Sequence, residues 1–251
     1  MPLQPKTPAQ IQAMRTGGKL LAEGLALVES KAKAGVSTAA LDAYIAEFFK
    51  EKNVTPAFLG YYGFPACICI SVNDEVIHGI PKEETILQEG DILDIDSGLI
   101  LDGMYLDAGY TFGVGEISEE ARLLIERTKK SFFKGISVVK PGATVGDYGY
   151  EVEKYLSQFD YGIIRDYAGH GIGAKLHEDP TIPNYGSRGQ GMKFIEGMTA
   201  AFEPMVTLGS EEVFLDADDD WTVLTDDGSL AAHYEHTVLI TKNGVELLTQ
   251  L

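Results

Sequence analysis

The chain has 251 residues, of which 38 are Asp or Glu and 20 are Lys or Arg, so its formal net charge is −18. This excess of negative charge gives no general attraction to nucleic acid or to an anionic membrane surface, and we expect no direct DNA binding. The hydrophobic fraction of 45% is too high for a disordered acidic chain, and the length suits one large folded domain.

Apolar residues recur at helical spacing in two segments near the start of the chain, and strand-like runs follow them. Asp102-Gly103 is a typical two-residue hairpin turn between two of these runs. The elements predicted for this half are two helices, one strand and a hairpin, over residues 8–30, 37–52, 67–72, 91–101 and 104–113. The second half follows the same order, with helices over 117–139 and 145–158 and strands over 162–168, 198–207 and 233–241.

A fixed offset supports an internal duplication of this pattern. Glu89 recurs as Glu196, 107 positions later, and at the same offset Asp96 falls on Glu203. We expect one domain over residues 1–251. Its two pseudo-symmetric halves would cover about residues 7–114 and 115–251. We expect the halves to share one antiparallel sheet with helices on its outer face, which is an α+β fold.

Two acidic side chains meet on the predicted hairpin. With the turn at Asp102-Gly103, Gly98 faces Asp107, and Asp96 lies two residues from Gly98 on the same face of the ribbon. Asp96 and Asp107 are then diagonal neighbours, about 8 Å apart or closer, and could bind adjacent metal ions. The surrounding positions are largely apolar, which favours a buried pair over two solvent-facing acids. Buried carboxylates need a cation or a proton.

The second half supplies matching groups in strand-like contexts. Glu203 lies in Ala-Phe-Glu-Pro-Met, Glu235 lies in Tyr-Glu-His-Thr, and His170 lies between glycines that allow close approach of backbone or ligand. A lone buried His is more often a hydrogen-bonded core residue, but four acids and one imidazole together favour a metal site. Four carboxylates balance two divalent ions, which would turn a shared water into a hydroxide nucleophile. The oxygen-rich set suits Mn or Fe, and also Co or Zn.

Cysteine usage indicates a reducing compartment. Cys67 and Cys69 lie two residues apart in a predicted strand, too close for a disulfide without strain. No stretch approaches the roughly 18 apolar residues of a membrane span, and the polar opening segment carries no signal-peptide core. We therefore expect a cytoplasmic protein with no membrane partner.

Several multi-residue motifs stand in a defined order: Tyr-Tyr-Gly-Phe-Pro (61–65), Ser-Val-Asn-Asp-Glu-Val-Ile-His-Gly-Ile-Pro (71–81), Gly-His-Gly-Ile-Gly (169–173), Leu-His-Glu-Asp-Pro (176–180), Phe-Glu-Pro-Met (202–205) and Tyr-Glu-His-Thr (234–237). With them the chain resembles the type I methionine aminopeptidases, from Lys6 almost to its C-terminus. The resemblance implies the pita-bread fold of that family, in which two α-α-β halves form a curved antiparallel sheet. It also implies removal of the initiator Met from nascent proteins, with preference for a small uncharged second residue, by a hydroxide that bridges two metal ions.

The resemblance implies a role for each candidate site residue. The metal ligands of the family fall on Asp96, Asp107, His170, Glu203 and Glu235. Asp107 and Glu235 would bridge the two ions, and Glu203 would also act as general base for the bridging water. His177 would stabilise the oxyanion of the scissile carbonyl, and His78 would hold the substrate beyond the cleaved bond. Without the resemblance, both of these would be interpreted as solvated loop histidines.

The resemblance further implies an apolar pocket for the Met side chain, lined by Tyr61, Phe64, Cys69, Leu176 and Trp221. Aromatic rings and a soft thiol suit a thioether, although ordinary core residues would give the same pattern. The chain departs from the family where Gly98 and Ala108 replace Thr and where Leu176 replaces Phe. These departures remove no metal ligand, but they bear on the hydrogen bonds around the ligands and on the shape of the pocket.

Two other functions fit parts of the pattern. A prolidase or aminopeptidase P shares the ligand set but usually carries an extra N-terminal domain, whereas the first ligand here is already Asp96. An inactive pita-bread protein that acts as a binding module would typically have lost ligands that are present here. We expect a monomer whose partner is the N-terminal Met of nascent chains. Transient ribosome contact stays open, because the basic cluster Lys129, Lys130 and Lys134 is more simply a solvated helix face.

Overall fold

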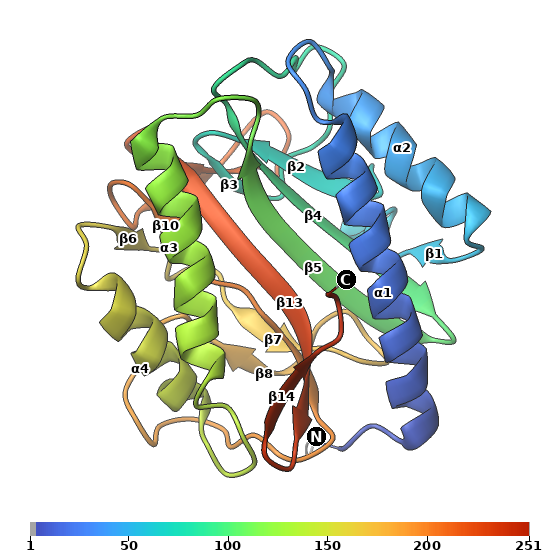
Figure 1. The fold of residues 1–251 in the computed structure, drawn as a ribbon, viewed down its shortest axis with the longest axis vertical. Helices are drawn as coiled ribbons and strands as arrows, with labels where there is room; N and C mark the ends of the chain where they lie inside the picture. The colour runs from blue at the N-terminus through green and yellow to red at the C-terminus, as the bar shows by residue number, and fades with distance from the viewer. Residues whose placement is uncertain (1–3, 251) are drawn as a thin grey trace.

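Four helices lie along one face of a large antiparallel sheet in the computed structural model, which describes residues 4–250 (Figure 1). Each helix begins after a Ser or Thr whose side chain accepts a hydrogen bond from the backbone N–H three residues on, so its first turn is capped. The helices are α1 Pro8–Lys31, α2 Thr38–Glu51, α3 Glu119–Ile136 and α4 Val145–Leu156.

The main sheet joins both halves of the chain in the strand order β1-β4-β5-β13-β9-β7-β8. Along this path the strands are β1 Thr55–Pro56, β4 Ile92–Leu101, β5 Met104–Gly113, β13 Ala231–Thr241, β9 Thr199–Phe202, β7 Gly169–Gly171 and β8 Glu178–Ile182. Four more strands extend it, namely β2 Ile68–Val72, β6 Gly162–Ile163, β10 Met205–Thr207 and β14 Gly244–Leu247. The hairpin β4–β5 pairs directly with β13, so strands that are more than 100 residues apart in the sequence lie side by side at the centre of the sheet (Figure 1).

A smaller three-stranded sheet, with the order β11-β12-β3, joins two distant segments of the chain. Its strands are β3 Glu75–Ile77, β11 Val213–Leu215 and β12 Val223–Thr225. β3 follows the strand β2 of the first half, whereas β11 and β12 belong to the long excursion that follows β10. The short 3-10 helix η1 Tyr61–Gly63 precedes β2.

Two apolar clusters fill the space between the helices and the sheet. α1 packs on β4 and β5, where Gly17 lies against Leu99 and Leu106. α3 packs on β13 and on α4, and its Phe132 is buried together with Tyr148 of α4. Because side chains alternate along a strand, residues such as Leu99 face the helices while their neighbours face the opposite side. That opposite side is where the polar groups of β4, β5 and β13 gather.

The α+β class, the four helices and the central hairpin are confirmed. The turn lies at Asp102-Gly103, and Gly98 pairs with Asp107 as expected. The expected strand over 162–168 is wrong beyond Ile163, because only two of its residues pair with β10. The strand expected over 198–207 is interrupted between β9 and β10, where Pro204 has no N–H to donate. The division into one domain with two halves stays a prediction. No helix within residues 4–250 is long and apolar enough to cross a membrane.

Candidate metal centre

Acidic side chains line up across the sheet on the side that faces away from the helices. Asp96 of β4 pairs with Gly109 of β5, which pairs in turn with Glu235 of β13. Strands β9 and β10 pair with β13 in one common register, and this register puts Glu203, between them, opposite Glu235. Asp96, Glu235 and Glu203, with Gly109 between the first two, therefore lie side by side on four neighbouring chain segments. We call this set the acidic row.

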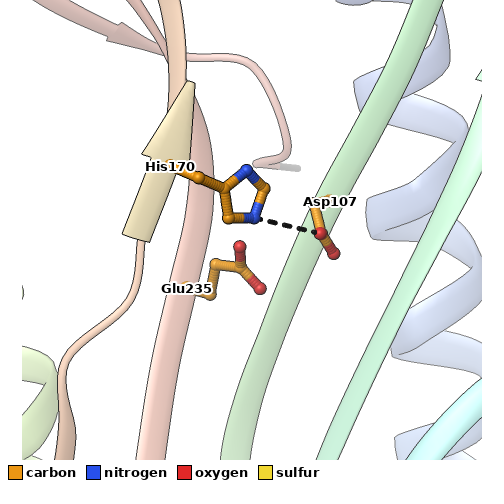
Figure 2. Close-up of side chains that lie close together, drawn as sticks. All are labelled: Asp107, His170 and Glu235. Atoms are coloured by element: carbon orange, nitrogen blue, oxygen red, sulfur yellow. Dashed lines mark ion pairs between the residues drawn. The ribbon is translucent and has the colours of Figure 1, made fainter. Parts of the chain in front are cut away.

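The next row on the same side adds a carboxylate and an imidazole. Asp107 of β5 contacts Thr237 of β13, and Thr237 pairs through an alanine of β9 with His170 of β7. Nε2 of His170 lies 3.8 Å from Asp107 Oδ2 and 3.6 Å from Glu203 Oε1. Figure 2 shows Asp107, His170 and Glu235 pointing toward one another from three strands. One potential ligand atom from each of these three side chains lies within 4.8 Å of the others.

Glycines beside the candidate ligands allow neighbouring groups to approach the backbone closely. A Cβ on Gly109, between Asp96 and Glu235, would lie 2.9 Å from the Cβ of Asp96. A Cβ on Gly171, directly after His170, would lie 2.1 Å from a carbonyl oxygen of β8. The glycines beside His170 therefore permit the expected close approach, and the group that approaches is the backbone of the neighbouring strand.

Burial raises the pKa of four carboxyl groups in the cluster. It raises the pKa of Asp107 to about 7 and that of Glu203 to about 8. The pKa values of Asp96 and Glu235 are raised by burial and by the neighbouring Asp107 carboxylate. Without a cation these groups would have to share protons near neutral pH, because buried like charges repel one another.

Three buried carboxylate oxygens of the cluster have no hydrogen-bond partner in the described part of the chain: Asp96 Oδ1, Asp107 Oδ1 and Glu235 Oε1. A buried polar atom without a partner costs about 1–3 kcal/mol, so three neighbouring ones call for an explanation. Divalent cations would satisfy all three oxygens and offset their repulsion. A set of carboxylates with one imidazole fits Mn, Fe, Co or Zn, and the residues therefore fit a metal centre.

His170 is held in the state that a metal ligand requires. Burial lowers its pKa to about 4, so the ring is neutral at physiological pH. Nδ1 lies 3.0 Å from the carbonyl oxygen of Gly171 and donates its proton there. Nε2 consequently keeps its lone pair and faces Asp107 and Glu203. Metal-binding histidines are commonly fixed in one tautomer by such a bond to a carbonyl.

A cavity of about 280 Å³ opens beside the carboxylates. Its wall includes all five residues expected to form an apolar pocket: Tyr61, Phe64, Cys69, Leu176 and Trp221. Phe64 packs edge-on against Trp221, with ring centroids 5.1 Å apart, and Cys69 is fully buried next to them. The wall also includes Phe58 and Tyr167, which the sequence did not single out. The apolar lining and the acidic row thus border one space.

The two remaining candidate histidines line the same cavity. His78 follows β3 with a φ of +61°, a conformation rare outside glycine, and its ring lies 6.3 Å from that of Trp221. Burial lowers the pKa of His78 to about 4. His177 precedes β8, with its Nδ1 2.8 Å from the Tyr61 hydroxyl and its ring 4.2 Å from that of His170. Both rings therefore border the space in which a substrate would meet the carboxylates.

Residues that the sequence did not single out hold the backbone of two acidic residues in place. Thr237 Oγ1 accepts a hydrogen bond from the Asp107 N–H at 3.0 Å and donates one to the Asp107 carbonyl at 2.8 Å. Asn184 donates to the Glu203 carbonyl, and the hydroxyl of Tyr148 donates to Asn184, both at 3.0 Å. No local motif marks Asn184 or Tyr148. Thr237 could have been found from its spacing of two residues from a predicted ligand.

The chain is similar to known proteins over almost its whole length. The sequence model of metallopeptidase family M24 matches residues 12–242 of the chain. The curated methionine aminopeptidase of Clostridium acetobutylicum is 51% identical over 244 residues, which are 97% of either chain. The crystal structure of methionine aminopeptidase from Thermotoga maritima has a TM-score of 0.97 and 42% identity, and the likeness covers 99% of this chain and 100% of that one.

A more distant likeness concerns the fold alone. The prolidase from Pyrococcus furiosus has a TM-score of 0.79 at 22% identity. The likeness covers 98% of this chain but 65% of the prolidase, so that enzyme has a further part that this chain does not match. These neighbours confirm the expected pita-bread architecture.

Proposed function

Since the chain belongs to metallopeptidase family M24, we infer that it is a methionine aminopeptidase, a metal-dependent hydrolase that removes an N-terminal methionine. Methionine aminopeptidases match nearly its whole length, whereas the prolidase likeness reaches only 22% identity. An inactive binding module is disfavoured as well, because all five candidate ligands are present in the sequence.

The cofactor that we propose is a pair of divalent ions held by five side chains: Asp96, Asp107, His170, Glu203 and Glu235. Asp107 and Glu235, which point into the same gap from neighbouring strands, are the proposed bridging ligands (Figure 2). The observation that carries this proposal is the trio of buried carboxylate oxygens without a partner among the described residues. When bound, the ions would polarise the scissile carbonyl and lower the pKa of a water molecule.

Proton transfer is assigned to Glu203 in this proposal. Its carboxylate would take a proton from the attacking water and pass it to the leaving amine. The pKa of Glu203, about 8 without a cation because of burial, would fall beside positive charge, so the group would be ionised when it acts. The Asn184 bond to the Glu203 carbonyl supports a fixed position for this base.

The two cavity histidines are proposed to hold the substrate. The Tyr61 hydroxyl occupies Nδ1 of His177, which leaves the Nε2–H of His177 to donate to the oxyanion that develops on the scissile carbonyl. His78 is proposed to hold the peptide beyond the cleaved bond. Its ring lies 5.9 Å from that of Tyr167, and this crowding supports a preference for a small uncharged second residue.

The substrate methionine side chain is assigned to the apolar end of the cavity. A thioether is unbranched and polarisable, and it packs well against aromatic rings. The edge-on pair of Phe64 and Trp221, with the Cys69 thiol beside it, supports this assignment. The size of the cavity, about 280 Å³, suits a single side chain rather than a long peptide segment.

We further propose that one domain acts as a monomer in the cytoplasm on nascent polypeptides, because a chain that still carries its initiator Met is newly made. Contact with the ribosome would be transient. Lys129 lies over the Tyr234 ring at 5.2 Å, and Lys130 pairs with Glu126 on the same helix. These internal contacts support a solvated helix face rather than an RNA-binding patch.

Release of Met from peptides that begin Met-Gly and Met-Leu tests the proposed function. We expect the protein treated with a chelator to be inactive, Co(II) or Mn(II) to restore activity, and Met-Gly to be cleaved much faster. Glu203→Gln should lower kcat by about 10²–10⁴-fold while the protein still unfolds cooperatively. Wild-type activity in that variant would contradict the assigned base, and preferential cleavage of Met-Leu would contradict the assigned substrate.

A further inference from the structure

A third row of the sheet lies directly beside the acidic row and is polar on all three of its strands. Asp94 of β4 pairs with Thr111 of β5, and the Thr111 hydroxyl accepts a hydrogen bond from the His233 N–H of β13 at 2.8 Å. The same hydroxyl lies 3.0 Å from Asp94 Oδ1 and donates to it. Asp94 precedes Asp96 by two residues, and His233 precedes Glu235 by two. Each therefore lies on the same side of the sheet as a candidate metal ligand.

The side chains of Asp94 and His233 form a buried pair. Oδ2 of Asp94 lies 3.4 Å from Nδ1 of His233, and the two side chains are 3% and 1% exposed. The other ring nitrogen, Nε2, lies 4.0 Å from Oε2 of Glu235 and has no hydrogen-bond partner within residues 4–250. The imidazole thus stands between two carboxylates. It already contacts the first, and it faces the second.

Stability alone is a poor explanation for this pair. Burying an ion pair removes two charged groups from water. A protein is often equally stable when apolar residues of similar size replace such a pair. The pair does have one clear geometric effect, since it keeps a ring nitrogen directed at Glu235. The ring nitrogen faces Oε2 of Glu235, and the other oxygen of that carboxylate, Oε1, has no hydrogen-bond partner in the described structure.

We propose that Asp94 and His233 are positioning residues for the metal centre, and that Nε2 of His233 binds and orients the Glu235 carboxylate. Asp94 holds the ring through Nδ1, and Thr111 fixes both Asp94 and the His233 backbone. When Glu235 is ionised as a metal ligand, its carboxylate can only accept this hydrogen bond, so the Nε2–H of His233 is the donor. This inference rests on the proposed function, because it takes Glu235 to be a metal ligand.

Titration of the metal-free protein with Co(II), followed by visible absorption and calorimetry, measures this effect directly. His233→Leu removes both ring nitrogens at similar volume, and we expect it to weaken Co(II) binding about 10–100-fold and to change the absorption spectrum. His233→Gln returns an N–H donor and should recover most of the binding. Asp94→Asn keeps the size of the group but removes its charge, and an intermediate loss is expected.

His236→Gln is the matched control. His236 is a buried histidine next to Glu235 in the same strand, but its side chain lies on the other side of the sheet. There it bonds to the hydroxyls of Thr249 and Tyr234 at 2.8 Å and 3.1 Å. We expect this variant to bind Co(II) as the wild type does. Thermal unfolding of the metal-free variants shows separately how much each substitution changes stability.

Weaker binding in His233→Leu with recovery in His233→Gln supports the inference. It is overturned if His233→Leu keeps wild-type affinity and spectrum, or if His233→Gln binds as weakly as His233→Leu. Should His233→Leu not fold, Asp94→Asn decides, and wild-type binding in that variant overturns the inference. A wild-type protein that takes up no Co(II) would refute the metal centre itself, and so the proposed function, whereas the other results leave that function standing.

Discussion

Replacing Thr237 with Val should remove the two hydrogen bonds that fix the backbone of Asp107. Thr237 is fully buried, and Asp107 is 5% exposed. The hydroxyl serves both the N–H and the carbonyl of Asp107, at 3.0 Å and 2.8 Å, and Val has the same shape without it. On the other side of Asp107, its β4 partner Gly98 uses its carbonyl to accept a hydrogen bond from the N–H of Ala57. Gly98 therefore offers the backbone of Asp107 no replacement for the lost hydroxyl. Thr237→Val therefore leaves one buried donor and one buried acceptor without partners.

Each such group costs about 1–3 kcal/mol, so the free energy of unfolding should fall by about 2–6 kcal/mol. Urea unfolding of the metal-free protein, followed by circular dichroism, measures this loss. Thr199→Val is the matched control, because Thr199 is equally buried but donates only one hydrogen bond, to the carbonyl of Ile172. Its expected loss is about 1–3 kcal/mol. A loss in Thr237→Val no larger than in Thr199→Val would refute the reasoning, as would undiminished Co(II) affinity.

Two further results are expected. With a chelator present, the melting temperature should fall as the pH rises from 6.5 to about 8. Burial raises the folded-state pKa of Asp107 to about 7 and that of Glu203 to about 8, so below these values the folded state binds more protons than the unfolded state. The stability that these protons provide is lost as the pH rises through the two pKa values. A calorimetric melting temperature that rises over this window would contradict the buried cluster. Asp219→Ala should raise KM and shift the fluorescence of Trp221, the single tryptophan, while the Co(II) affinity stays unchanged. The reason is that Asp219 accepts hydrogen bonds from the backbone N–H groups of Trp221 and Thr222, at 2.9 Å and 2.8 Å, and so holds the indole in the cavity wall. Unchanged KM and emission would contradict this positioning of Trp221.

The central hairpin could be predicted because its signals are local. Asp102-Gly103 sets the turn, the turn sets the register, and the register puts Asp96 and Asp107 on one face. The order of helices and strands follows from the spacing of apolar residues in the same way. The facing positions of Glu203 and Glu235 could not be derived like this, because their alignment depends on pairing between strands far apart in the sequence.

Short strands and buried polar partners were beyond the reach of the sequence pattern. β7 has only three residues, two of them glycine, so His170 gave no alternation that could place it in the sheet. Asn184 and Tyr148 meet Glu203 only through the packing of α4 against the sheet. Asp94 and His233, in contrast, each lie two residues before a predicted ligand, and that spacing was available in the sequence.

The small sheet β11-β12-β3 has a consequence for how the protein is made. β3, at residues 75–77, finds its partner only when residues 223–225 have been synthesised. Asp96 and Asp107 likewise meet their counterpart Glu235 near the end of the chain. Contacts between such distant segments slow folding, because the intervening chain must first be ordered. A ribosome-bound fragment that ends before β13 would carry three of the four carboxylates, Asp96, Asp107 and Glu203, but would lack Glu235 and the strand that joins the two halves of the sheet. An enzyme proposed to trim emerging chains would thus become competent only after its own β13 has emerged.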